Sequence, residues 1–194
     1  MTLKVAKVSE ARVKVDATRW EELLDRKAVL EEIALTMWVK ANEAFDDQGR
    51  PEGTWSPRFA PNFAGIVNRL NRGLSPRASD FEPKPALHDT GRLKNSLAHR
   101  VRGNVAEVGT NVPYATRMQE GGPSEITLTP QGQERLGKWL RENRSNRYYR
   151  ENLGWLFGKP SFTVDVQARP FLVVTEEDVA EFAEIVAQHI EAAQ

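Results

Sequence analysis

The chain contains no cysteine among its 194 residues. This absence excludes disulfide frameworks, thiolate zinc sites, iron–sulfur clusters and cysteine nucleophiles. A chain of this length buries roughly 70% of the surface that its unfolded state exposes, so it needs neither a disulfide nor a metal to fold. We therefore expect a stable hydrophobic core without covalent or metal cross-links.

Long apolar runs are also missing. No stretch of 18 consecutive apolar residues occurs, which predicts no transmembrane helix. The first residues, Met1 to Lys7, lack the apolar core of a signal peptide. We expect the protein to be made and used in the cytoplasm, with no membrane partner.

An excess of one charge is absent, because 27 basic residues balance 27 acidic ones. Nucleic-acid-binding proteins are usually more basic. The charges are segregated, however: residues 50–103 hold ten basic and four acidic side chains, and residues 132–160 hold seven and three. Residues 161–194 hold one basic side chain, Arg169, against seven acidic ones. Opposite charges suit head-to-tail contact between identical subunits, although charge runs more often mark solvated faces.

Apolar periodicity and capping signals divide the first half of the chain. Alternation over residues 3–15 predicts one or two short strands. A capping box at Thr18 begins a long helix that runs to about Ala44 with a single apolar stripe. A shorter helix is predicted at about 63–72, and the proline-containing stretch 74–85 is predicted to be a loop.

The second half alternates short strands with helices. Thr90 is predicted to cap a short helix, and a hairpin is predicted around Gly103-Asn104, where both residues tolerate positive φ. Further strands are predicted at 126–128, 162–166 and 171–174. Further helices are predicted at 114–120, from a Thr129 cap to about 143, and from a Thr175 cap to the C-terminus.

This order of elements predicts the α+β class, because strands and helices are segregated. We expect an antiparallel β-sheet packed by the long N-terminal helix and the C-terminal helix. A helical insertion at about 123–160 completes one domain over residues 1–194.

An enzyme is a remote alternative. The triplet Asp89-Thr90-Gly91 occurs in aspartic proteases, where two carboxylates share a proton. A single copy would require a symmetric dimer, and the charged residues that follow the triplet do not suit a buried active-site floor. The three histidines show no metal-ligand spacing, so no catalytic, cofactor-binding or metal-binding residue is predicted.

A nucleic-acid-binding module is a second alternative. Basic residues recur every three positions and alternate with aromatic ones, a combination that grips phosphates and stacks on bases. A three-residue step drifts around a helix and gives a slanted band rather than a stripe. The aromatic residues equally suit interface anchors or the insertion's own small core. The segment comprises Arg135, Lys138, Trp139, Arg141, Arg144, Arg147, Tyr148, Tyr149 and Arg150, followed by Trp155.

Several short motifs occur in a characteristic order and spacing. They are a turn around Trp55, the element Asp89-Thr90-Gly91-Arg92-Leu93, the hairpin end Val108-Gly109-Thr110, the turn Pro113-Tyr114-Ala115, and Ala168-Arg169-Pro170-Phe171-Leu172. Together they resemble the phage virion morphogenesis (tail-completion) family of head–tail joining and Mu-like minor tail proteins. The resemblance covers most of the chain, and the insertion at 123–160 departs from shorter members.

The resemblance implies a structural part of the virion without catalysis or cofactor. Its expected partners are further copies of itself in a ring, for which we expect six, together with other neck or connector proteins and the tail-tube protein. Its expected place is the neck or tail, after assembly in the host cytoplasm. Tail completion, tail termination and head completion all stay open. The motif residues, Arg92 and Arg169 above all, are candidates for ion pairs or subunit contacts.

Contact with DNA is expected to be weak and non-specific at most, because the total charge is zero. Phosphate contacts lose affinity steeply as salt rises. Filter binding of duplex DNA should therefore fall to background at about 200 mM salt. Tight binding that survives this salt concentration would favour the nucleic-acid-binding alternative.

Overall fold

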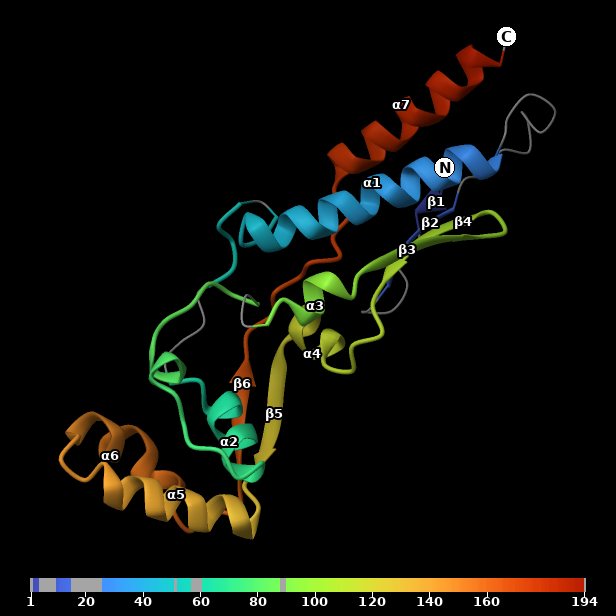
Figure 1. Ribbon diagram of the computed structural model, residues 1–194. Coiled ribbons are helices and arrows are strands. Elements are labelled where there is room, and N and C mark those ends of the chain that lie inside the picture. The colour runs from blue at the N-terminus through green and yellow to red at the C-terminus, as the bar shows by residue number, and fades with distance from the viewer. Residues whose placement is uncertain are drawn as a thin grey trace. The chain divides into compact units, whose positions relative to one another are not determined.

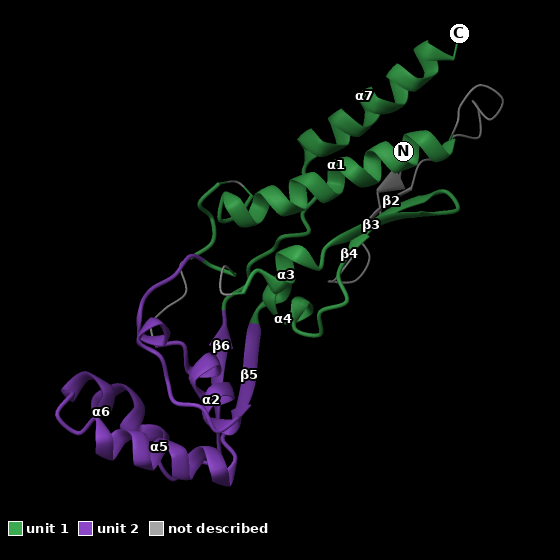
Figure 2. Ribbon diagram, viewed as in Figure 1, with its two compact units in different colours: residues 1–56, 86–121, 167–194 green, residues 57–85, 122–166 purple. Residues whose placement is uncertain are grey.

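The computed structural model describes residues 2–3, 10–14, 26–50, 52–56, 61–87 and 90–193, with backbone alone for the first two ranges. The chain divides into two compact units (Figure 2). Unit 1 comprises residues 1–56, 86–121 and 167–194, and unit 2 comprises residues 57–85 and 122–166. The predicted mixture of helices and antiparallel strands is confirmed, while the single-domain organisation stays a prediction.

Unit 1 contains a four-stranded antiparallel sheet with the strand order β1-β2-β4-β3. The predicted hairpin is confirmed, because β3 and β4 pair from Ala98 opposite Gly109 to Arg102 opposite Val105. Its turn contains Gly103 with φ of 55°. The strands are β1 (Thr2–Leu3), β2 (Glu10–Lys14), β3 (Ala98–Arg102) and β4 (Val105–Gly109).

Two long helices pack with this sheet to form the core of unit 1 (Figure 1). Helix α1 (Arg26–Asp46) lies against β3 and β4, and α7 (Glu176–Ala192) packs along α1. The predicted start of the first helix at Thr18 lies outside the described residues. Apolar positions of α1 recur at three- and four-residue steps, so one face of the helix is buried. Ile33 and Phe45 on this face are fully buried, as is Phe182 of α7.

The short helix α3 (Arg92–Asn95) begins differently from the prediction. Its N-cap is Gly91 with φ of 68°, a left-handed conformation that suits glycine because it has no Cβ. Thr90 stands one residue earlier, and its hydroxyl accepts a hydrogen bond from the Arg92 amide at 3.3 Å. Thr90 therefore supports the helix start without occupying the capping position.

The predicted strand at 171–174 is wrong, because this segment is irregular. Its amides bond to α4 (Ala115–Glu120) instead of to a strand. The Arg169 amide donates to the Met118 carbonyl at 2.7 Å. The amides of Phe171 and Leu172 both donate to Oε1 of Gln119, at 2.9 and 3.1 Å. A glutamine side chain thus satisfies the backbone that a neighbouring strand was expected to satisfy.

Unit 2 has its own core between helices and a two-stranded sheet. The strands predicted at 126–128 and 162–166 pair with each other and form a separate sheet from that of unit 1. The stretch 74–85, predicted to be a loop, contains the 3₁₀ helix η1 (Ala78–Phe81). The remaining elements are α2 (Phe63–Asn71), β5 (Gly122–Thr127), α5 (Pro130–Glu142), α6 (Arg147–Leu153), the 3₁₀ helix η2 (Gly154–Leu156) and β6 (Ser161–Val166).

The start of α5 confirms the cap predicted at Thr129. Its hydroxyl accepts from the Gly132 amide at 3.1 Å, and Pro130 occupies the first turn, where no amide is needed. Asn71 at the end of α2 fixes the same turn, because its Oδ1 accepts from the Thr129 amide at 2.9 Å. The side-chain amide of Asn71 also donates to the Thr127 carbonyl at 2.8 Å. One asparagine therefore joins α2, β5 and α5 within unit 2.

Candidate functional site

Two of the sequence motifs meet in the core of unit 1. Trp55 and Phe171 are buried, and both contact Phe45 near the end of α1. The ring centroids of Phe45 and Trp55 lie 5.5 Å apart, and those of Phe45 and Phe171 lie 5.4 Å apart. Leu93 of the Thr90-Gly91-Arg92-Leu93 element belongs to the same core cluster. These motif residues therefore hold the fold together and are covered in the single chain.

Arg169 is a buried member of the last motif. Its Nη2 donates to the Ser56 carbonyl at 3.4 Å, next to Trp55. Burial of a guanidinium costs free energy unless its N–H groups donate hydrogen bonds. The Ser56 carbonyl accepts one of them and so helps to hold Arg169 in place. Pro170 follows Arg169 in the chain. The next amide, that of Phe171, donates to the side-chain oxygen of Gln119, which orients Phe171 toward the core.

A second group of motif residues lies on the surface of unit 1. Thr90, Arg92 and Tyr114 are exposed, and Gly109 ends strand β4. Among the described residues no ion pair involves Arg92, so an ion pair for it stays a prediction. Asp89 lies outside the described residues. Exposed motif side chains are the ones available for contact with another molecule.

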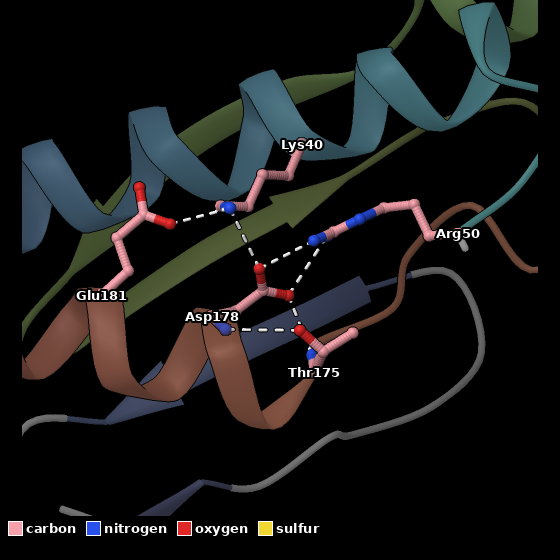
Figure 3. A network of polar contacts seen from close by, with 5 residues as sticks. All are labelled: Lys40, Arg50, Thr175, Asp178 and Glu181. Atoms are coloured by element: carbon pink, nitrogen blue, oxygen red, sulfur yellow. Dashed lines mark hydrogen bonds and ion pairs between the residues drawn. The ribbon is translucent and has the colours of Figure 1, made fainter. Parts of the chain in front are cut away.

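A polar cluster of unit 1 involves none of the candidate residues predicted from the sequence. It surrounds the carboxylate of Asp178, whose residue is only 1% exposed at the start of α7 (Figure 3). Arg50 donates to both carboxylate oxygens, at 2.8 and 3.1 Å, and the Lys40 ammonium lies 3.1 Å from Oδ1. The Thr175 amide donates to Oδ2 at 2.8 Å, which completes the helix cap. Glu181 pairs with Lys40 at 2.7 Å from the outer side.

The electrostatics of this cluster favour the ionised forms. Burial alone would raise the pKa of Asp178, but the hydrogen bonds from Arg50, Thr175 and Lys40 outweigh it and leave the pKa below its ordinary value. Burial likewise would lower the pKa of Lys40, but its bonds to Glu181 and Asp178 leave the pKa raised. Both groups therefore remain charged near neutral pH, and the carboxylate is fully occupied by donors.

This arrangement joins three segments of unit 1, because both carboxylate oxygens of Asp178 already accept hydrogen bonds. The cavity beside the cluster has a volume of about 10 Å³, which is room for about one water molecule. No group of three or more histidine, aspartate or glutamate residues capable of holding a metal occurs in the part of the chain that the structure describes. The capping box at Thr175 was visible in the sequence, but the arginine partner stands 128 residues away. No local signal could have linked them.

The basic and aromatic segment of unit 2 divides between core and surface. Trp139 is buried and stacks on Phe81 with an interplanar angle of 4°, and Tyr149 packs against both rings. Tyr148 and Trp155 are exposed. Trp139 and Tyr149 therefore serve mainly local packing.

The basic residues of the segment fall into two groups, those in ion pairs and those without one among the described residues. Lys138 pairs with Glu142 at 3.9 Å, and Arg147 pairs with Glu151 at 2.6 Å. Arg135 is half-buried beside Gly73. The exposed arginines 141, 144 and 150 form no ion pair with any residue that the structure describes. Fewer unpaired positive charges are therefore available on this segment than the number of its basic residues predicts.

The fold is of the α+β class. Its buried charged groups, centred on Asp178, join segments of unit 1. No helix among the described residues has both the length and the apolar character needed to cross a membrane. The phage virion morphogenesis family model matches residues 6–191, so the chain belongs to this family of phage structural and assembly proteins. No curated protein and no solved structure is significantly similar to the chain.

Replacing Asp178 with asparagine should lower the free energy of unfolding by about 3–5 kcal/mol, because two buried cations lose their counter-charge. Glu181→Gln is the matched control. It removes a half-exposed carboxylate that pairs with Lys40, so its cost should stay below about 1 kcal/mol. Urea unfolding at pH 7 measures both, and equal effects of the two substitutions would contradict the role assigned to Asp178.

Comparison of the wild-type protein with Asp178→Asn also gives a pH test. Because the folded pKa of Asp178 is lowered, its contribution is present above the unfolded value of about 3.9 and is lost as pH falls through the folded pKa. The wild-type protein should therefore lose more stability than Asp178→Asn between pH 5 and strongly acidic solution. Parallel curves for the two proteins would show that Asp178 does not contribute to acid unfolding.

Proposed function

We propose that the protein is a ring-forming subunit at the junction between phage head and tail, acting in tail completion, tail termination or head–tail joining. The observation that carries the proposal is membership of the virion morphogenesis family over nearly the whole chain. An assembly part requires surfaces for other protein subunits, and the exposed motif residues of unit 1 and the exposed aromatic residues of unit 2 are candidates for such surfaces.

Charge distribution supports a ring in particular. Unit 2 contains twelve basic and seven acidic residues, a net charge of +5, while unit 1 contains fifteen basic and twenty acidic residues, a net charge of −5. A ring needs contacts in which one surface binds a different surface on the next copy. Two units of opposite charge in each copy meet that requirement, because complementary potentials steer and orient association.

Exposed motif residues are the first candidates for contacts with other neck proteins or with the tail-tube protein. Arg92 and Tyr114 lie on the surface of unit 1 without a structural partner for their side chains among the described residues. Arginine and tyrosine are both enriched among the residues that dominate binding energy at protein interfaces. Their position next to buried motif residues gives them a rigid base.

The nucleic-acid alternative loses support from the arrangement of unit 2. Trp139 is buried and so is not available to stack on a base, and Lys138 and Arg147 are each paired with a glutamate. A continuous basic and aromatic track of the kind that single-stranded nucleic acid requires is therefore interrupted.

The solution mass of the purified protein should show closed oligomers of a single size, or a monomer that closes into rings when the tail-tube or connector protein is added. Light scattering after size exclusion gives the mass, and negative-stain images of the same fraction show a central hole. A stable two-fold dimer with no higher assembly under either condition would contradict the proposal.

A further inference from the structure

A turn on unit 2 displays two large aromatic side chains to solvent. Phe157 is 60% exposed and Trp155 is 40% exposed. We call the surface formed by Trp155, Phe157, Lys159 and Arg141 the aromatic patch. Its apolar side chains are too exposed to contribute fully to the core of unit 2, while side chains of this kind dominate binding energy when a partner covers them.

The patch is held in place by its own unit. Gln133 of α5 accepts from the Gly158 amide at 3.0 Å and donates to the Lys159 carbonyl. The Trp155 indole donates to the Asn152 carbonyl at 2.8 Å, and its ring contacts Phe63 and Phe162. A rigid surface loses little conformational entropy on binding, so the exposed rings are prepared for a partner.

Positive charge accompanies both aromatic rings. The Lys159 ammonium lies 5.2 Å from the centroid of the Trp155 ring. The Arg141 guanidinium and the Phe157 ring both lie within 4 Å of the point where a Cβ on Gly137 would stand. Arg141 forms no ion pair with a described residue, and unit 2 has a net charge of +5. The chemistry of the patch therefore calls for a partner that is acidic and able to cover aromatic rings.

Helix α7 in unit 1 carries the complementary charge. It contains six carboxylates and no lysine or arginine. At about 100° per residue, four of its glutamates fall within an arc of about 80°, centred about 110° around the helix from Phe182 and Ile185. The four are Glu177, Glu181, Glu184 and Glu191. Of these, Glu181 pairs with Lys40, and no ion pair within the described residues involves the other three.

We propose that the aromatic patch of one copy docks on the acidic face of α7 in the next copy. The proposal rests on the ring function proposed above and names its subunit contact. Because the two surfaces differ, the contact is heterologous and repeats around a closed ring. A second copy fits better than nucleic acid, since the chain is neutral overall and unit 1 supplies the missing negative charge.

Charge reversal tests the contact on the full-length protein. One variant carries E177K, E184K and E191K, and leaves Glu181 to its pairing with Lys40. The other carries R141E and K159E. Each variant alone should assemble about tenfold more weakly than wild type or worse, because like charges then face each other. An equimolar mixture of the two should regain assembly, because each remaining interface joins opposite charges.

Regained assembly in the mixture also shows that both variants are folded. A matched control carries E43K, E52K and E120K, which make the same charge change at exposed positions of unit 1 outside α7. This control should assemble like wild type. Phe157→Ala should weaken assembly by about tenfold or more, while Leu74→Ala, at a 44% exposed position of unit 2 outside the patch, should not.

Sedimentation velocity at low and moderate salt provides the readout. Rings that persist in both charge-reversal variants overturn the contact but leave the ring function intact. A mixture that stays dissociated, although circular dichroism shows both variants folded, also overturns it. Unchanged assembly with loss of duplex DNA binding in the R141E and K159E variant alone would assign the patch to nucleic acid. Wild-type protein that forms no rings, either alone or after the tail-tube or connector protein is added, contradicts both the ring function and this contact.

Discussion

The buried carboxylate of Asp178 is the interaction on which the arrangement of unit 1 most depends. It joins three parts of the chain, since Lys40 lies on α1, Arg50 follows that helix, and Asp178 begins α7. A buried charge is costly in isolation, so removal of any partner leaves an uncompensated ion. Hydrophobic burial of Phe182 and Ile185 holds α7 against unit 1, and the charge cluster ties the first turn of α7 to Lys40 and Arg50.

That fixed position of α7 has a consequence for assembly. The same helix that uses Asp178 inside unit 1 exposes four glutamates to solvent, namely Glu176, Glu177, Glu184 and Glu191. The aromatic residues of unit 2 are likewise split between core and surface, since Trp139 is buried and Phe157 is exposed. Each unit therefore completes its own core and still offers a surface of distinct charge. A subunit of a ring needs such a combination, because each copy must be stable and must bind two neighbours through different surfaces.

Local signals in the sequence were sufficient for most elements. Turn chemistry at Gly103 and capping at Thr129 and Thr175 predict a hairpin and two helix starts that the structure contains. The strand predicted at 171–174 fails because the amide of Gln119, far away in sequence, replaces a neighbouring strand. The cluster around Asp178 could not be predicted for the same reason: its partners are brought together only by tertiary packing. Exposure of individual aromatics likewise depends on the packing of unit 2 and not on local spacing.

The most direct test of a structural role in the particle is the copy number of this chain in purified phage. Quantitative mass spectrometry of gradient-purified virions gives that number relative to a protein of known abundance. A ring at the junction of head and tail predicts a small, fixed number of copies per particle that does not change between preparations. Complete virions that lack the chain, or contain it in variable traces, would contradict the account.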